Sequence, residues 1–393
     1  MVKILHGSEF SRLHGSPGKN RNYFTAKTQL CHQKGGISKQ MEIKLRSISW
    51  IINNRCNLNC IHCYPDSGKE IKPAYSPHRM DTICSHLGTV SANYVFISGG
   101  EPLLDKQFLD YLRIACKIAR QEVWICSNGL PLTEDILYRS RQEGATGYIL
   151  SLQHHIPSRM DEICRSKGVY SKVMETIARI KKSNLQFSLE MTLMRFNKDS
   201  IEPLIRLSNE LGAKIVAFKR FRPIGRGKDH DDYGFPKEEH WELLRCILEQ
   251  SLKKNSVEIR GHDPMYGVVA LKYFKEQGLK GEALARKMES FMGCNAGARW
   301  IGIDPRGNVS PCPLLGAAGV TIGNILSQSL KEIIEESGEI ESLKKSRQNK
   351  TTCDYWQICR GCRAHSYVSG GHLFAKDPLC IEDDFLCPSG TIS

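Results

Sequence analysis

Residues 46–230 combine two patterns of apolar and polar positions. Short apolar runs rich in β-branched residues, typical of buried strands, occur at 48–54, 94–99, 122–128, 147–152, 187–194 and 214–221. Between them, stretches such as 106–121 and 171–184 carry apolar residues near the 3.6-residue spacing of helices. Six such strand–helix units require parallel strands with right-handed crossovers. We therefore expect an α/β fold, a partial (β/α)6 barrel of the TIM type, because a closed barrel needs eight units.

The patterns divide the chain into four segments. Residues 1–45 are polar and rich in Gly and Ser, which predicts a loosely packed lead-in. The barrel occupies 46–230, and a helical bridging region is expected at 231–292. Residues 293–393, in which cysteines cluster, are expected to form a small α+β domain. In barrels of this kind the loops at the carboxyl ends of the strands carry function.

The loop after the first strand, "NNRCNLNCIHCYPDSG", places Cys56, Cys60 and Cys63 at spacings of three and then two intervening residues. No other cysteine falls between Cys31 and Cys84, so the loop offers three ligands and not the four of a closed zinc site. Three thiols on one loop can hold three corners of a four-iron cluster and leave one iron open to a small molecule. A structural zinc loop that borrows a distant ligand is the alternative.

The second strand ends in "SGGEP", residues 98–102. Gly99 and Gly100 allow backbone N–H and C=O groups to approach a ligand, although such a pair also occurs in tight turns. With the cysteine loop, this motif makes the chain resemble the radical S-adenosylmethionine (SAM) enzymes. These enzymes carry Cys-x3-Cys-x2-Cys after the first strand and Gly-Gly-Glu-Pro after the second.

The resemblance implies a mechanism and a set of contacts. Cys56, Cys60 and Cys63 would hold a 4Fe–4S cluster whose open iron is chelated by the amino and carboxylate groups of SAM. An electron from a flavodoxin- or ferredoxin-type donor would cleave SAM reductively, and the 5′-deoxyadenosyl radical would abstract a substrate hydrogen. The residues expected to contact SAM are Gly99, Gly100 and Glu101 at the amino group, His62 beside adenine, and Ser127, Asn128 and Ser151 at strand ends. Gln153 stands where many relatives have Asp, and no catalytic acid or base can be assigned.

A second group of cysteines lies in the C-terminal hundred residues. Cys294 and Cys312 belong to a Cys-x12-Gly-x4-Cys pattern, whose Asp-Pro-Arg-Gly centre is typical of a hairpin. The remaining cysteines of this region are Cys353, Cys359, Cys362, Cys380 and Cys387. The set resembles the SPASM or shorter twitch extension, which carries auxiliary 4Fe–4S clusters, although Cys-x5-Cys-x2-Cys replaces the usual Cys-x2-Cys-x5-Cys-x3-Cys run.

The seven tail cysteines leave the number of auxiliary clusters open. They could ligate one four-iron cluster fully, or two with one of them incompletely ligated. A zinc ribbon at Cys359 and Cys362 is the alternative, because Cys-x2-Cys is also a zinc spacing.

Composition limits the compartment and the partners. The 393-residue chain lacks a secretory signal and any apolar run of membrane-spanning length, which predicts a cytoplasmic protein without a membrane partner. In a reducing compartment, clustered thiols such as those among its 16 cysteines bind metal more often than they form disulfides. The formal net charge of +13 would fall to about +9 with three clusters bound. The basic residues are scattered without interleaved aromatics, which argues against a nucleic-acid partner and leaves an anionic small substrate open.

The resemblance leaves the substrate open between two classes. SPASM-bearing relatives mostly modify ribosomal peptides or proteins, and a branch with a similar tail processes tetrapyrroles on the way to haem or haem d1. We expect a radical SAM oxidoreductase that matures a ribosomal peptide or protein. Tetrapyrrole modification and a non-catalytic iron–sulfur electron carrier are the alternatives. Pro313 stands where sulfatase maturases have an Asp after the cysteine, which argues against that activity.

Two arginines at the end of the sixth strand also need partners. Arg220 and Arg222 are two residues apart and share one face of the strand. An arginine buried there requires an anion, which could be an acid of the fold or a carboxylate of SAM or of the substrate.

Overall fold

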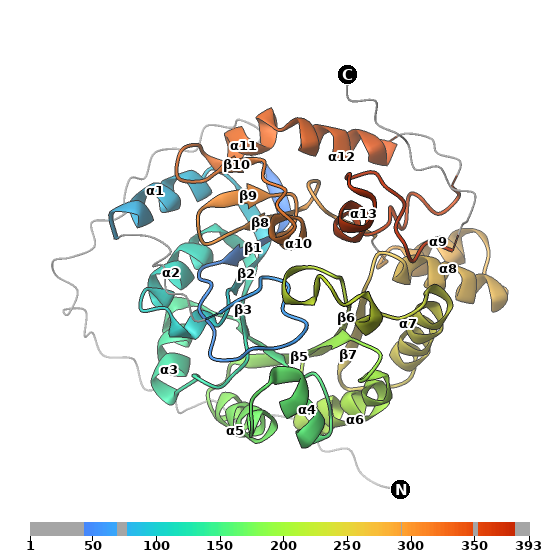
Figure 1. The fold of residues 1–393 in the computed structure, drawn as a ribbon, viewed down its shortest axis with the longest axis horizontal. Coiled ribbons are helices and arrows are strands. Elements are labelled where there is room, and N and C mark those ends of the chain that lie inside the picture. The colour runs from blue at the N-terminus through green and yellow to red at the C-terminus, as the bar shows by residue number, and fades with distance from the viewer. Residues whose placement is uncertain (1–42, 69–76, 292, 349–352, 382–393) are drawn as a thin grey trace, which may run out of the picture. The chain divides into compact units, whose positions relative to one another are not determined.

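The computed structural model describes residues 43–68, 77–291, 293–348 and 353–381. Most of the predicted lead-in and Cys387 lie outside the described residues. Within these ranges, one sheet of ten strands has the order β10-β9-β8-β1-β2-β3-β4-β5-β6-β7. Strands β1 to β7 pair in parallel and curve into a partial barrel with helices on its outside (Figure 1).

The six predicted strands of the barrel are confirmed, with ends that shift by a few residues. They are β1 (Lys44–Ile51), β2 (Ser91–Ser98), β3 (Ala119–Ser127), β4 (Gly147–Ser151), β5 (Gln186–Leu193) and β6 (Ile215–Arg220). Helices cover the outer face, so side chains on both faces of a strand are buried and the strands are continuously apolar. Trp50 and Ile51, consecutive residues that point to opposite faces of β1, illustrate this, since they are 0% and 6% exposed. The barrel helices are α1 (Pro77–Leu87), α2 (Phe108–Ile118), α3 (Glu134–Glu143), α4 (Pro157–Cys164), α5 (Val169–Lys182) and α6 (Ile201–Leu211).

The bridging region adds a strand that the sequence did not predict. Strand β7 (Glu258–His262) pairs in parallel with β6 and forms one edge of the sheet. Its sequence, EIRGH, contains one aliphatic residue and a glycine, so it lacks the apolar run of a buried strand. The helices of this region are α7 (Lys237–Leu252), α8 (Tyr266–Glu276) and α9 (Gly281–Met288).

The C-terminal segment continues the barrel sheet past β1. Strands β8 (Trp300–Ile303) and β9 (Asn308–Ser310) form the predicted antiparallel hairpin, and β10 (Gly323–Asn324) pairs with β9. Gly307, at φ +86°, occupies the turn. Strand β8 also pairs in parallel with β1, and the Trp300 indole donates to Ser49 Oγ at 2.9 Å. The helices here are α10 (Pro313–Ala317), α11 (Leu330–Glu336), α12 (Gly338–Gln348) and α13 (Arg363–Gly370).

A buried ionic network joins the barrel to the tail. Arg220 Nε lies 2.6 Å from Asp263 Oδ2, and its Nη1 lies 2.9 Å from Asp377 Oδ2. Asp263 also bonds His240 Nε2 at 2.8 Å. Burial alone would raise the pKa of the Asp263 carboxyl, but the adjacent guanidinium holds that pKa well below its ordinary value. Arg220 is therefore neutralised by acids of the fold, and not by a substrate carboxylate.

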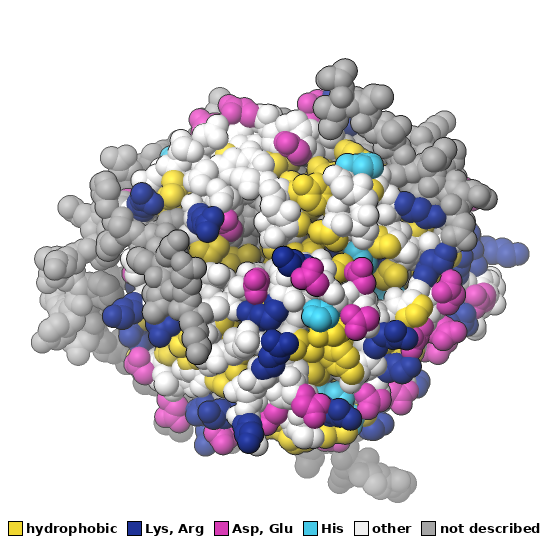
Figure 2. Space-filling view, in the orientation of Figure 1, with side chains coloured by type: hydrophobic (Ala, Val, Ile, Leu, Met, Phe, Trp, Pro, Cys, Tyr) yellow, Lys and Arg dark blue, Asp and Glu magenta, His cyan; other side chains and the backbone are white. Residues whose placement is uncertain are grey.

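The described surface carries charges of both signs. On the face drawn in Figure 2, Lys and Arg side chains are interspersed with Asp and Glu. Such mixing is typical of solvated helix faces and unlike the basic stripe of a nucleic-acid interface. Within the ranges described above, the helices are too short or too polar to cross a membrane.

We expect Arg220→Met to lower the free energy of unfolding by about 3–5 kcal/mol, because it leaves two buried carboxylates without their cation. Anaerobic urea unfolding of the reconstituted protein measures this loss. Arg245→Met is the matched control, since Arg245 pairs with Glu249 and Glu276 at the surface and should change the urea midpoint little. Equal midpoints for the two variants would contradict the structural role of Arg220.

Candidate functional site

The cysteine loop follows β1 at the carboxyl end of the strand. Cys56, Cys60 and Cys63 are half-buried and form no disulfide. The backbone N–H groups of Leu58 and Ser67 donate to the sulfurs of Cys56 and Cys63, each at 3.4 Å. Burial, with contributions from the neighbouring Cys60 and Cys63, raises the pKa of the Cys56 thiol to about 11. The thiols are therefore protonated at neutral pH without metal, and metal ligation would displace these protons.

The donor set of this loop suits an iron–sulfur cluster. Neighbouring thiols with N–H groups directed at their sulfurs are the typical cluster environment. Each thiolate of a four-iron cluster binds a different iron, so the ligands do not converge on one point. Over the described ranges, His, Cys, Asp and Glu side chains form no group of three arranged around a single ion.

Cys164, a buried thiol of the barrel, lies beside the cysteine loop. It ends α4 and is 2% exposed. Contact with Cys164, together with burial, raises the pKa of the Cys60 thiol. The Ile61 N–H donates to the Ile163 carbonyl at 3.1 Å, which holds α4 against the loop. The two cysteines are about a hundred residues apart in sequence, so spacing gave no sign of this contact.

Gly99 and Gly100 pack against the cysteine loop. A Cβ at Gly100 would lie 2.3 Å from the Arg55 carbonyl, and one at Gly99 would lie 2.6 Å from Asn53 Oδ1. The Gly100 N–H donates to the Asn53 side chain at 3.1 Å, and Asn53 Nδ2 donates to the Glu101 carbonyl at 3.1 Å. Because Gly99 and Gly100 have no side chains, the ends of β1 and β2 can lie in direct contact. The sequence did not single out Asn53, which lies inside the predicted strand 48–54; a polar side chain near the end of that apolar run was the available signal.

Glu101 joins the ends of β2 and β3. Its carboxylate accepts hydrogen bonds from Ser127 Oγ at 2.9 Å and from the Asn128 N–H at 2.8 Å. It is fully buried, and burial raises its pKa to about 7. Asn128 in turn donates to Asn57 Oδ1 of the cysteine loop at 2.7 Å. Three of the residues predicted to bind SAM therefore contact one another beside the predicted cluster loop.

His62 carries a polar atom that fits a bound cofactor. Its Nδ1 is buried and has no hydrogen-bond partner among the described residues. Burial, assisted by the charge of Arg226, lowers its pKa to about 4, so the imidazole is neutral. Ser151 lies half-buried at the end of β4. Gln153 accepts from the Thr192 N–H at 2.8 Å and thereby connects β4 to β5.

The loop that leaves β6, residues 222–227, contacts the cysteine loop. Gly225, at φ +65°, would place a Cβ 2.2 Å from the Tyr64 carbonyl. The Arg226 guanidinium donates to the Cys60 carbonyl at 2.8 Å and also to the Ser67 carbonyl. The β6 loop therefore fixes the backbone of the cysteine loop.

Three tail cysteines form a first set, Cys294, Cys312 and Cys362. Cys312 and Cys362 are buried in one apolar cluster, and Cys294 packs against it. Burial, with contributions from the other two thiols, raises the pKa of Cys312 to about 12. Arg222 Nε donates to Cys362 Sγ at 2.9 Å.

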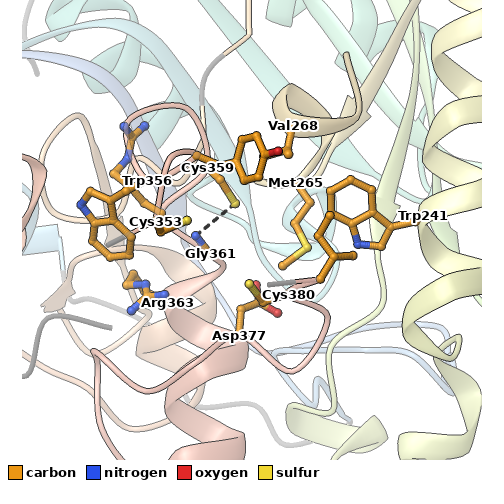
Figure 3. A pocket seen from close by; sticks show the side chains of 13 residues that line it. Trp241, Met265, Val268, Cys353, Trp356, Cys359, Gly361, Arg363, Asp377 and Cys380 are labelled. Carbon is orange, nitrogen blue, oxygen red and sulfur yellow. Dashed lines mark hydrogen bonds between the residues drawn. The ribbon is translucent and has the colours of Figure 1, made fainter. Parts of the chain in front are cut away.

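Three further cysteines form a second set, Cys353, Cys359 and Cys380. They line one pocket together with Trp241 and Met265 (Figure 3). The Gly361 N–H donates to Cys359 Sγ at 3.3 Å, and burial raises the pKa of that thiol. Cys359 and Cys362 therefore have different neighbours, which favours two separate groups over a zinc ribbon, where both would bind one ion.

Two family models match the chain. The Radical SAM superfamily model matches residues 50–208, which hold the cysteine loop and the Gly-Gly-Glu-Pro turn. The SPASM model, described as an iron-sulfur cluster-binding domain, matches residues 294–363.

Curated relatives cover most of the chain at low identity. The "AdoMet-dependent heme synthase" of Methanosarcina barkeri is 26% identical over 346 residues, 86% of this chain and 96% of the relative. The "Mycofactocin maturase MftC" of Mycolicibacterium smegmatis is 25% identical and covers 85% of this chain and 82% of the relative.

Solved structures share the fold. Streptococcus suis SuiB bound to S-adenosylmethionine matches with a TM-score of 0.66 at 14% identity, over 85% of this chain and 77% of SuiB. Native anSMEcpe with bound AdoMet matches with a TM-score of 0.65 at 16% identity, over 85% of this chain and 94% of that protein. These structures show the shared fold. The two family models identify a Radical SAM domain and a C-terminal SPASM domain in this chain, which indicate an enzyme whose cofactors are SAM and iron–sulfur clusters.

Proposed function

We propose that Cys56, Cys60 and Cys63 ligate the SAM-binding 4Fe–4S cluster and that the enzyme modifies a peptide or protein. The observation that carries this proposal is the contact between the three-thiol loop and the Gly99–Gly100 turn at one end of the barrel. When bound, the cluster and SAM supply one-electron cleavage of a sulfur–carbon bond and abstraction of a substrate hydrogen.

The chain's own residues hold the cysteine loop and the ends of the strands in place. Asn53 and Glu101 connect the ends of three strands by hydrogen bonds, so the loop has little freedom to move. The neutral His62 offers an unpaired Nδ1 to adenine. Gly99, Gly100 and Asn128 would border the amino acid and ribose parts of SAM, while Ser127 and Glu101 position Asn128. Ser151 would add a hydroxyl at the end of β4.

A peptide or protein substrate is supported by the mycofactocin maturase relative, which covers 85% of this chain. The fold is also shared with SuiB, whose structure has been solved with the precursor peptide SuiA. The reducing electron would come from a flavodoxin or a ferredoxin.

A tetrapyrrole is the second candidate substrate. The Methanosarcina barkeri heme synthase is matched over 96% of its length, and a "Fe-coproporphyrin III synthase" of the same organism is 22% identical. The formal net charge of +13 would suit a substrate with several carboxylates.

We assign the two tail sets to two auxiliary clusters. Cys294, Cys312 and Cys362 would ligate the first, and Cys353, Cys359 and Cys380 the second. Cys387, outside the described residues, is a candidate for one further ligand position. The support is the separate surroundings of the two sets, one in an apolar cluster beside Arg222 and one around the pocket of Figure 3.

Anaerobic reconstitution with SAM and dithionite tests the proposed function. The enzyme is incubated with candidate precursor peptides and, separately, with iron coproporphyrin, and mass spectrometry follows each substrate. A mass change in a peptide together with 5′-deoxyadenosine would support the first candidate. A change confined to the porphyrin would replace it with the second, and absence of 5′-deoxyadenosine under all conditions would reject the enzymatic proposal.

Replacement of Cys56, Cys60 or Cys63 by Ala should abolish 5′-deoxyadenosine formation, because the cluster loses one of three ligands. Cys164→Ala is the matched control, since this thiol touches Cys60 but leaves the three ligands in place. Its iron content and SAM cleavage should remain near the wild-type values. Retention of cleavage in the triple Ala variant would contradict the ligand assignment.

The tail assignment predicts iron content in that triple Ala variant. It should retain about eight irons per chain, and adding either Cys312→Ala or Cys353→Ala should reduce this to about four. Each addition should remove a different electron paramagnetic resonance (EPR) signal. If Cys312→Ala or Cys353→Ala alone removed all of the remaining iron, the tail would hold a single cluster. Stoichiometric zinc in place of iron would indicate a zinc ribbon.

A further inference from the structure

The loop that leaves β6 contacts both cysteine regions. Its Gly225 and Arg226 hold the backbone of the cysteine loop, as described above. At its other end, Arg222 Nε donates to Cys362 Sγ at 2.9 Å. Between them, the buried Ile224 lies in the apolar cluster that contains Cys312 and Cys362.

The guanidinium of Arg222 is held in place and directed at sulfur. Its Nη1 donates to the Arg220 carbonyl at 2.9 Å, so the planar group is fixed at two points. Cys362 is fixed as well, because it is 4% exposed and its backbone N–H donates to Asp377 Oδ2. The contact is therefore not a chance approach of two mobile side chains.

Among the described residues, no carboxylate contacts the guanidinium of Arg222, and Asp263 interacts with it only at longer range. The neighbouring Arg220 pairs with Asp263 and Asp377, but none of the described Asp or Glu side chains forms an ion pair with Arg222. A half-buried cation beside a cysteine sulfur favours negative charge on that sulfur and on whatever the sulfur ligates.

We propose that Arg222 is a positioning residue for the auxiliary cluster of Cys294, Cys312 and Cys362 and that it raises the reduction potential of this cluster. The inference rests on the proposed function, because it assumes that this set holds a cluster. Reduction adds one electron, and so one negative charge, to the cluster. A hydrogen bond to a ligating sulfur and a nearby cation both stabilise the more negative state.

The test is an EPR-monitored redox titration of the full-length chain. In a background with Cys56, Cys60, Cys63 and Cys353 replaced by Ala, only the first tail cluster should remain. At the midpoint potential of this background, we expect Arg222→Met to lower the ratio of reduced to oxidised cluster about tenfold, which is about 59 mV for a one-electron couple. Arg222→Lys should lower this ratio less, because lysine keeps the positive charge but cannot form the two hydrogen bonds of the planar guanidinium.

Lys228→Met is the matched control. Lys228 lies just beyond the same loop and is exposed, so the variant removes an equal charge without touching a cysteine and should leave the ratio unchanged. A second control uses a background with Cys312→Ala in place of Cys353→Ala. There Arg222→Met should not change the potential of the second tail cluster.

The outcomes separate the inference from the proposed function. Equal ratios in Arg222→Met and Lys228→Met, with the cluster present in both, would overturn the role of Arg222 and leave the cluster assignment intact. If the Arg222→Met variant loses its cluster, the Arg222→Lys variant provides the test. An unchanged ratio of reduced to oxidised cluster in Arg222→Lys would overturn the inference. Absence of iron and of an EPR signal in the background itself would reject the first tail cluster and the inference with it.

Discussion

The fixed position of the tail against the barrel depends on the buried Arg220 and its two carboxylates. Arg220 ends β6, Asp263 follows β7 and Asp377 belongs to the tail, so the two ion pairs of one guanidinium join three separate parts of the chain. At the opposite side of the barrel, β8 extends the sheet from β1. The tail is thus attached at both edges of the parallel sheet. Because a buried charge needs its partners in place, the tail cannot shift without a large cost.

This double attachment has a consequence for the two cysteine regions. Asp377 accepts both from Arg220 and from the backbone of Cys362, so the ionic network also fixes a tail cysteine. The β6 loop then runs from Cys362 to the cysteine loop through Arg222, Ile224 and Arg226. The apolar cluster around Cys312 includes Tyr64, which follows Cys63 directly in sequence. The end of β6 and the loop after it therefore contact both cysteine regions and fix the position of one relative to the other.

Patterns of neighbouring residues in the sequence predicted the strands and the turn whose formation depends on residues close together in the chain. The six barrel strands were visible as apolar runs because both of their faces are buried, and the hairpin at 300–312 was visible through its Asp-Pro-Arg-Gly turn. Strand β7 was missed because an edge strand with the sequence EIRGH carries no such run. The pairing of β8 with β1 and the contact between Cys60 and Cys164 were missed because both join distant residues. Spacing alone likewise could not divide the tail cysteines into two sets, since Cys359 and Cys362 are close in sequence but have different neighbours.

The cations at the end of β6 limit what an anionic substrate can bind there. Arg220 is buried and fully paired, and Arg222 is directed at the sulfur of Cys362. Lys219 pairs with Glu190 at 2.5 Å, and its side chain is 37% exposed. The Glu190 side chain is only 18% exposed, so a substrate carboxylate that displaced it would leave a largely buried acid without its cation. Of these three cations, Lys219 alone forms a partly exposed ion pair, so an anionic substrate that reached this strand would meet Lys219 together with Glu190 and not a free cation.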